Sequence, residues 1–261
     1  MPWRIPKYIQ HLFYLSYRKG HGIHSPYLFE FVNKVIFNGA ALTLPPEILK
    51  AHRELKRDQT MIPVTVLGAS SSVDSSGERS VGSFVSHSSV PEKYGSLLYR
   101  ISRWFEPEMI IELGSGLGIS TLYLASGSPR VPLHSIEGNP HRALFAEKVV
   151  TGRKLDMVNI HQGEMEKELD KLIPQMKGRF VAFVDGNHRY EPTIAYVRKL
   201  IEVAGEDALI IMDDIYWSKE MYEAWREVIS WKEVRVSIDL YQMGILLLRP
   251  DLDKADFKIK F

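Results

Sequence analysis

Short apolar segments alternate with longer amphipathic segments from about residue 91 to the C-terminus. Each short segment is mostly apolar and lies between polar turns, which predicts strands at residues 109–113, 133–136, 156–161, 180–184 and 208–212. The longer segments have apolar residues at helical spacing, and the first of them carries on one face Leu97, Leu98, Ile101, Trp104 and Phe105. Strands that alternate with helices are typical of an α/β fold with a largely parallel sheet.

The chain also carries signals for how this pattern ends and where helices begin. Two final apolar runs, 234–240 and 244–248, are too close in sequence for a helical crossover, so they predict an antiparallel hairpin. Asn139 before Pro140 predicts one helix start, because asparagine is a good N-cap and proline suits the first helical position. Ser218 predicts another helix start in the same way.

The first 90 residues differ in composition and pattern from the rest of the chain. They hold an aromatic-rich segment at 3–17, a Gly/His turn at 20–26 and a predicted helix from 46 to about 59. In residues 68–89, ten of 22 are serine, which favours turns and a mobile loop over regular structure. We therefore expect a mostly helical N-terminal extension at 1–90, with a Ser/Gly-rich loop as lid or linker, followed by one domain at 91–261.

Composition and charge narrow the possible functions. Lys and Arg number 33 against 32 Asp and Glu, so no strong cationic field is present and we do not expect a nucleic-acid partner. The absence of cysteine excludes disulfides, thiolate metal ligands and a cysteine nucleophile. No apolar run approaches the roughly 18 residues of a membrane span, and no signal-peptide pattern opens the chain, so we expect a cytoplasmic protein.

A glycine-rich stretch follows the strand expected at 109–113. Its residues are Glu112, Leu113, Gly114, Ser115, Gly116, Leu117 and Gly118. Glycines at a turn from strand to helix let a ligand approach the backbone closely. The nicotinamide fingerprint needs a third glycine at position 119, where this chain has Ile119, so dinucleotide binding is disfavoured. An acid two residues before the first glycine suits a cofactor with an ammonium group and no pyrophosphate, and Glu112 would face that cation.

A second acid lies where the next expected strand ends. Glu137 follows Gly114 by 23 residues. A carboxylate at this place in an α/β sheet can accept hydrogen bonds from both hydroxyls of a ribose. Ligands of such folds bind at the carboxyl ends of the strands, which is where both acids fall.

These residues resemble the class I S-adenosylmethionine-dependent methyltransferases over roughly residues 89–250. The resemblance implies a Rossmann-like sheet of seven strands, mostly parallel with an antiparallel last strand. It also implies cofactor contacts from Glu112, Gly114, Ser115, Gly116, Glu137, Gly163, Glu164 and Asp185. The pair Gly163-Glu164 stands where the family has a Gly-acidic pair near the adenine, and it departs from the common Gly-Asp-Ala because Met165 follows it.

Carboxylates also follow the two strands expected at 180–184 and 208–212. They are Asp185 after the first strand and Asp213 and Asp214 after the second. Neighbouring parallel strands lie about 4.8 Å apart, so these carboxylates are expected to converge and repel one another unless a cation binds. Ligands that are all oxygen atoms favour Mg²⁺ or Ca²⁺ over zinc.

This second pattern resembles the Mg²⁺-dependent small-molecule O-methyltransferases of the catechol, caffeoyl-CoA and macrolide-sugar (macrocin) types. The resemblance implies Mg²⁺ or Mn²⁺ on Asp185, Asp213 and Asp214, with His188 as the base. Asp214 departs from the catechol type, which has an asparagine there. The same residues also allow simpler roles: Asp185 could bind only cofactor, Asp213-Asp214 could cap a helix, and His188 could be a surface histidine.

Other residues carry weaker signals. His21 and His24 could be metal ligands or substrate contacts, but hydrogen-bonded turn histidines explain them better. Aromatic residues recur along the N-terminal segment and could touch a membrane surface or a substrate, although core or homodimer packing explains them better; they are Trp3, Tyr8, Phe13, Tyr14 and Tyr17.

The favoured function is therefore S-adenosylmethionine-dependent O-methylation of a small-molecule hydroxyl, assisted by a divalent ion. Methyl transfer depends on alignment of the reacting groups, and such an ion would supply it. Two alternatives remain at this stage. One is a methyltransferase that acts on a macromolecule, with residues 1–90 as recognition module. The other is a catalytically silent cofactor-binding scaffold.

Overall fold

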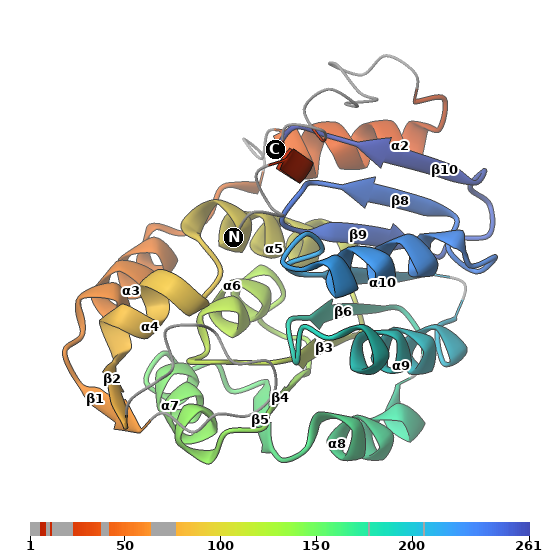
Figure 1. The fold of residues 1–261 in the computed structure, drawn as a ribbon. Coiled ribbons are helices and arrows are strands. Elements are labelled where there is room, and N and C mark those ends of the chain that lie inside the picture. The colour runs from red at the N-terminus through yellow and green to blue at the C-terminus, as the bar shows by residue number, and fades with distance from the viewer. Residues whose placement is uncertain are drawn as a thin grey trace. The chain divides into compact units, whose positions relative to one another are not determined.

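A computed structural model describes residues 6–8, 11, 23–37, 42–63, 77–176, 178–205 and 207–261 (Figure 1). A mixed sheet of eight strands runs in the order β10-β8-β9-β7-β6-β3-β4-β5, and β1 and β2 form a small separate sheet. The chain divides into two compact units, residues 39–171 and residues 1–38 with 172–261. The division expected at residue 90 stays a prediction.

The unit of residues 39–171 holds three parallel strands of the main sheet and the helices around them. Its elements are α3 (Pro46–Arg57), β1 (Met61–Pro63), β2 (Glu78–Ser80), α4 (Val81–Ser88), α5 (Glu92–Phe105), β3 (Met109–Leu113), α6 (Ile119–Gly127), β4 (Leu133–Glu137), α7 (Pro140–Thr151), β5 (Val158–Gln162) and α8 (Met165–Leu172). Within it β4 pairs in parallel with both β3 and β5. Asn139 caps α7 by accepting hydrogen bonds from the backbone N–H of His141 and Arg142, and Pro140 opens the helix, as predicted.

The other unit holds the remaining five strands of the main sheet. Its elements are α2 (Pro26–Phe31), η1 (Val32–Phe37), η3 (Ile173–Gln175), β6 (Phe180–Val184), α9 (Tyr190–Glu202), β7 (Ala208–Met212), α10 (Lys219–Ser230), β8 (Val236–Asp239), β9 (Gly244–Leu247) and β10 (Ala255–Lys258). β9 runs antiparallel to both β7 and β8, whereas β6–β7 and β8–β10 are parallel pairs. Every residue of β6 and β7 is buried, which explains their unbroken apolar sequences.

The expected fold class is confirmed, with two differences in detail. The five apolar runs form β3 to β7, and the last two form the antiparallel hairpin β8–β9. The sheet has eight strands instead of seven because β10 pairs with β8. The loop expected at 68–89 is wrong for residues 78–88, which form β2 and α4. Ser80 caps α4, so serines here start a helix as well as making turns.

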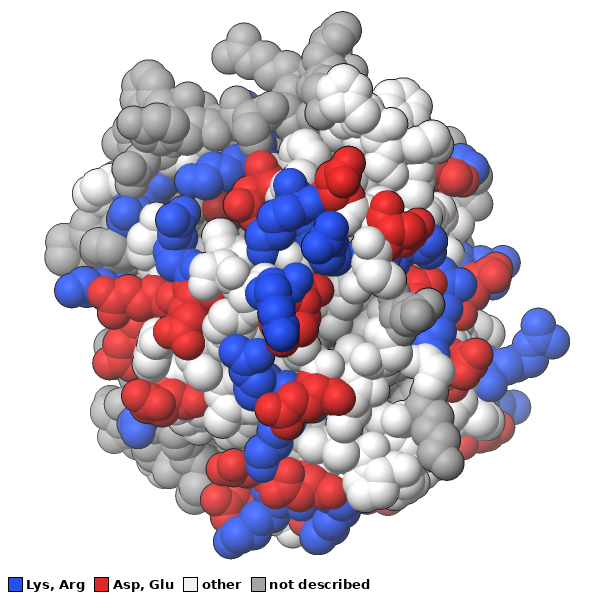
Figure 2. All heavy atoms as spheres, turned by 90° about the vertical axis from the view of Figure 1, so that its right-hand side faces the viewer, with Lys and Arg blue, Asp and Glu red and all other residues white. Residues whose placement is uncertain are grey.

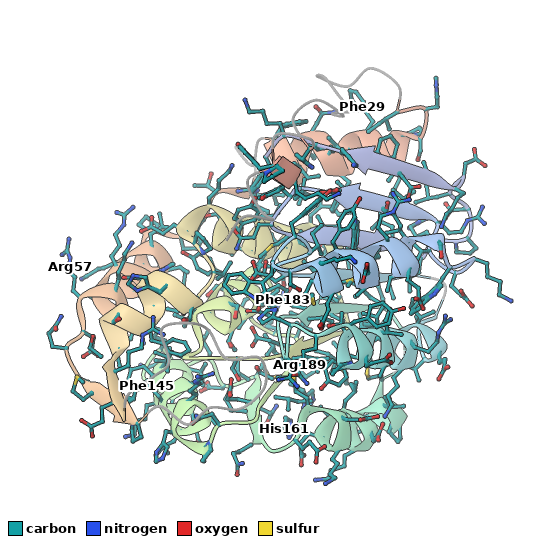
Figure 3. The ribbon with its side chains drawn as sticks, in the orientation of Figure 1. Phe29, Arg57, Phe145, His161, Phe183 and Arg189 are labelled. Atoms are coloured by element: carbon teal, nitrogen blue, oxygen red, sulfur yellow. The ribbon has the colours of Figure 1, made fainter. Side chains whose placement is uncertain are left out.

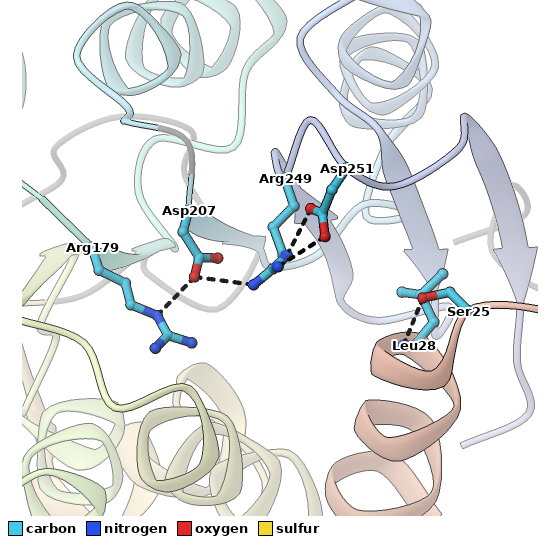
Figure 4. Close-up of polar contacts among 6 residues, drawn as sticks. All are labelled: Ser25, Leu28, Arg179, Asp207, Arg249 and Asp251. Atoms are coloured by element: carbon cyan, nitrogen blue, oxygen red, sulfur yellow. Dashed lines mark hydrogen bonds and ion pairs between the residues drawn. The ribbon is translucent and has the colours of Figure 1, made fainter.

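Surface charges form local pairs. In the unit that contains β6 and β7, Asp207 lies 3.0 Å from Arg179 and 3.3 Å from Arg249, and Arg249 makes two further contacts with Asp251 (Figure 4). The hydrogen bonds from Arg249 lower the pKa of the Asp251 carboxyl. On the face drawn in Figure 2, acidic and basic side chains intermingle. Among the helices of the described ranges, none is both long and apolar enough to cross a bilayer.

Candidate functional site

The glycine-rich loop after β3 needs its glycines for backbone reasons. Gly114, Gly116 and Gly118 have φ angles of 102°, 52° and 84°, in a region that side-chain-bearing residues rarely adopt. The N–H of Gly114 donates to the carbonyl of Ile136 at 2.8 Å, which ties the loop to β4. A Cβ at Gly118 would lie 3.3 Å from the Cα of Ala146, so this glycine also permits close packing on α7.

Glu112, the predicted ammonium ligand, is completely buried at the end of β3. Its Oε2 accepts hydrogen bonds of 2.5 Å from the hydroxyls of Thr121 and Ser135. Its Oε1 is buried and has no hydrogen-bond partner of good geometry among the described residues, and the nearby Ser120 hydroxyl also acts on the carboxylate. Burial raises the pKa of the Glu112 carboxyl, and the neighbouring hydroxyls offset part of that effect.

Ser115 supplies a second buried polar atom without a partner. Its hydroxyl is buried in the loop and hydrogen-bonds to none of the described residues. Buried polar groups are nearly always paired, so such atoms in one loop point to a group that binds there. Because an ammonium group carries several donors, the free Oε1 of Glu112 and the hydroxyl of Ser115 fit the amino-acid end of S-adenosylmethionine.

Glu137, the predicted ribose ligand, ends β4 and is 6% exposed. Its Oε2 accepts the N–H of Gly116 at 2.9 Å, and its Oε1 accepts the N–H of Asn139 at 2.8 Å. Burial raises the pKa of this carboxyl, and the N–H of Asn139 and the charge of Arg142 oppose that rise. Each carboxylate oxygen can accept more than one hydrogen bond, so Glu137 retains capacity for two ribose hydroxyls.

Gly163 and Glu164, the pair predicted to lie near the adenine, have different surroundings. The N–H of Gly163 donates to the backbone carbonyl of Glu137 at 3.1 Å, so Gly163 lies beside the predicted ribose ligand. Glu164 is exposed, and its carboxylate lies 2.7 Å from the ammonium of Lys167. Its place near an adenine stays a prediction.

In the other unit, Asp185 and His188 occupy a tight turn after β6. Figure 3 labels Phe183 on β6 and Arg189 at the start of α9, and the turn lies between them in sequence. The Nε2 atom of His188 lies 3.5 Å from Oδ1 of Asp185. The N–H of His188 donates to the carbonyl of Gly186 at 2.9 Å, and Asn187 and His188 both have positive φ, 70° and 42°. The turn therefore holds the imidazole beside a carboxylate.

Asp213 and Asp214 follow β7. Asp213 is 4% exposed, and its N–H donates to the carbonyl of Val184 at 2.9 Å. Asp214 has a φ of 52°, and its carbonyl accepts the N–H of Trp217 at 2.7 Å. The parts of the chain that the structure describes contain no group of three His, Asp or Glu side chains that could hold a metal ion. The expected convergence of Asp185, Asp213 and Asp214 into such a group is therefore not seen.

Aromatic side chains surround the segment after β7. The ring centroid of Trp217 lies 6.4 Å from that of His188. The hydroxyl of Tyr216 donates to Oδ2 of Asp239 at 2.8 Å, and burial together with Asp239 raises the pKa of Tyr216.

From the N-terminal aromatic segment, Tyr8 packs edge-on against Tyr241, with centroids 4.9 Å apart. Outside the described residues lie Trp3, Phe13, Tyr14, Tyr17 and His21. His24 is exposed.

Sequence reasoning did not identify the partners that hold the two buried acids. Ser135 lies opposite Glu112 in the parallel register of β3 and β4, so strand pairing places its hydroxyl there. Asn139 was expected only as a helix cap, yet its N–H also binds Glu137. Register is the signal that would have found Ser135, whereas Thr121 is brought to Glu112 by the packing of α6.

Residues 111–215 match the family model described as a methyltransferase domain. The match includes every candidate residue from Glu112 to Asp214. This part of the chain is therefore similar to a methyltransferase domain. No curated protein matches this chain.

Solved structures support the fold of this methyltransferase domain. The chain resembles cofactor-bound Rv0187 from MTB, with 17% identity, coverage of 88% of this chain and 99% of that chain, and a TM-score of 0.57. It resembles the O-methyltransferase from Bacillus cereus in complex with SAH (15% identity, 84% and 96% coverage, TM-score 0.56). It also resembles the O-methyltransferase TomG from Streptomyces achromogenes, involved in tomaymycin synthesis, in complex with SAM (17%, 83% and 96%, 0.52). At these identities the likeness shows the fold alone.

Proposed function

We propose that this methyltransferase transfers the methyl group of S-adenosylmethionine to a hydroxyl of a small molecule. The observation that carries the cofactor assignment is the pair of buried polar atoms without partners, Oε1 of Glu112 and the hydroxyl of Ser115. Two solved structures of the same fold are named O-methyltransferases, one with SAH and one with SAM, and their names support the choice of a hydroxyl acceptor.

Residues of the unit 39–171 would bind the cofactor. Glu112 and Ser115 would accept hydrogen bonds from its ammonium group, and Glu137 would accept both ribose hydroxyls. Glycine at the left-handed position 116 lets the loop make this turn without the strain that a side chain would add. When bound, the cofactor supplies a methyl group activated by its positively charged sulfur.

His188 would act as the general base. Oδ1 of Asp185 lies 3.5 Å from Nε2 of His188, so this carboxylate would orient the ring. The hydroxyl proton would pass to His188 as the acceptor oxygen gains the methyl group and the bond from sulfur to that methyl breaks. His188 would take up the released proton while the cofactor would lose its positive charge, so charge would balance without a further reactant.

The divalent ion implied by the resemblance has less support. Asp185 already faces His188, and the described residues provide no three-ligand group. The carboxylates therefore do not fit an ion in this arrangement, and none of the roles given above for Glu112, Ser115, Glu137 or His188 depends on one. An assay in excess chelator decides the question: turnover that survives removes the ion, and turnover restored by Mg²⁺ or Mn²⁺ supports it.

Two measurements test the proposed function. Calorimetry of the purified protein should show SAH binding and no comparable binding of NAD, and Glu137→Ala should weaken SAH binding by about 2 kcal/mol or more because charge-assisted hydrogen bonds are lost. Glu147→Ala, an exposed change on α7, is the matched control. Labelled S-adenosylmethionine is then offered with small-molecule hydroxyls, protein, RNA and DNA. Tighter binding of NAD, or transfer only to a macromolecule, would overturn the proposal.

A further inference from the structure

Arg142 occupies a position in α7 that helix electrostatics disfavour. It lies in the first turn, where the helix dipole is positive and where this helix has no acidic residue. A cation is disfavoured there by the same effect that favours anions. Among the residues that the structure describes, its guanidinium makes no ion pair or side-chain hydrogen bond, so local pairing does not compensate for this placement. A charged residue that breaks a local rule in this way is a candidate for a functional role.

The guanidinium of Arg142 is held on an aromatic ring. Its Cζ lies 4.7 Å from the centroid of Phe84, which is within range of a cation–π interaction. Phe84 is 5% exposed, and its Cε1 atom lies 3.5 Å from where a Cβ at Gly116 would stand. The Phe84 ring therefore lies against the glycine loop, and the guanidinium of Arg142 lies over the same ring. In Figure 3, Phe145 marks α7, the helix of Arg142.

The position of Phe84 is fixed from two sides. The N–H of Gly82 donates to the carbonyl of Asp58 at 2.8 Å, and a Cβ at Gly82 would lie 2.5 Å from the carbonyl oxygen of Lys56, so α4 packs tightly on the end of α3. Figure 3 labels Arg57 at that end of α3. Arg79 donates to the hydroxyls of Ser83 and Ser88, which ties the preceding strand to α4.

Two further charged groups belong to this arrangement. The guanidinium of Arg79 on β2 lies 5.3 Å from the centroid of Phe84, and Glu137 accepts a hydrogen bond from the glycine loop that Phe84 contacts. Two backbone N–H groups hold the carboxylate of Glu137, from Gly116 on the loop and Asn139 at the start of α7. The charges that act on it are Arg142 on α7, which favours the ionised form, and Glu112 on β3, which repels it. Because Asn139 also caps the N–H of Arg142, the acid and the cation lie at the same helix start.

We propose that Arg142, held on the ring of Phe84, is a positioning residue that keeps Glu137 ionised and able to accept the ribose hydroxyls. Burial raises the pKa of Glu137 and Arg142 counters that rise, which agrees with this role. The inference rests on the proposed cofactor site. Removing the cation would raise the pKa of Glu137, so the acid-side loss of cofactor binding would begin at a higher pH.

The test is the pH dependence of SAH affinity, measured by calorimetry from pH 5.5 to 7.5. We compare wild type with Arg142→Gln, Arg142→Lys and Phe84→Leu, and use Lys148→Gln, an exposed change on the same helix, as control. Arg142→Gln should increase the ratio of the dissociation constants at pH 5.5 and 7.5 by about 3- to 10-fold, because one pKa unit corresponds to a tenfold change. Phe84→Leu should change the ratio in the same direction, and Arg142→Lys and Lys148→Gln should stay near wild type.

The outcomes separate this inference from the proposed function. If wild type fails to bind SAH, the proposed function and this inference both fail. If wild type binds SAH and Arg142→Gln keeps the wild-type ratio, only the role of Arg142 is wrong. A loss of affinity in Arg142→Gln that is equal at all pH values would also overturn it, since Arg142 would then contact the ligand instead of acting through Glu137.

Discussion

Replacing Glu137 by glutamine changes one atom of a carboxylate that already serves two backbone donors. The oxygens accept N–H groups of Gly116 and Asn139 at 2.9 and 2.8 Å. In Glu137→Gln, one oxygen becomes an NH₂ group that must face one of these N–H groups, donor against donor. The shape of the side chain is preserved, so the effect reports on hydrogen bonding and charge and not on a cavity.

The expected magnitude follows from these contacts. One charge-assisted hydrogen bond of about 1.5 to 3 kcal/mol is lost within the protein. Removing a buried charge offsets part of that loss, because burial disfavours the ionised form. We therefore expect a lower melting temperature, by about 2 to 4 °C for each kcal/mol. Toward the cofactor, losing one charged acceptor should weaken SAH binding by about 10- to 100-fold.

Calorimetric titration with SAH and a thermal melt of the same samples measure the two effects separately. Glu147→Gln, which removes an exposed carboxylate from α7, should match wild type in both. A melting temperature that falls while SAH affinity stays within about twofold of wild type would refute the reasoning. In that case Glu137 would serve only to join the glycine loop to α7.

Two further predictions concern the remaining acid and the base. Glu112→Gln should weaken SAH binding but raise the melting temperature at pH 8, because burial raises the Glu112 pKa and the ionised group destabilises the fold above that pKa. Scanning calorimetry should show that this gain in melting temperature shrinks as the pH falls toward the ordinary glutamate pKa. An equal gain at every pH would contradict this prediction. His188→Ala should lower kcat by about 10²- to 10⁴-fold, with SAH affinity little changed. Near-normal turnover of this variant would make His188 only a neighbour of the site.

The cofactor side of the fold was predictable because its signals are local. Strand-ending acids and left-handed glycines lie within one strand and turn, as at Glu112 and Gly114. The packing around these residues was harder to predict from the sequence. The segment 78–88 was expected as loop because serine dominates it, yet Val81, Phe84 and Val85 are buried at helical spacing behind the cap Ser80. The eighth strand, β10, was also missed, although Ala255 and Phe257 alternate with the polar Asp256 and Lys258. It pairs with β8 at the edge of the sheet.

Backbone conformation differs between the candidate residues after β3 and those after β6 and β7. After β3, the left-handed positions are glycines, which suits a loop that a ligand approaches by its main chain. After β6 and β7, the left-handed positions are Asn187, His188 and Asp214. Asparagine, aspartate and histidine tolerate positive φ better than most residues, although glycine would relieve the strain entirely. Positive φ at His188 is a conformational cost, which agrees with the role proposed above for its side chain as the base.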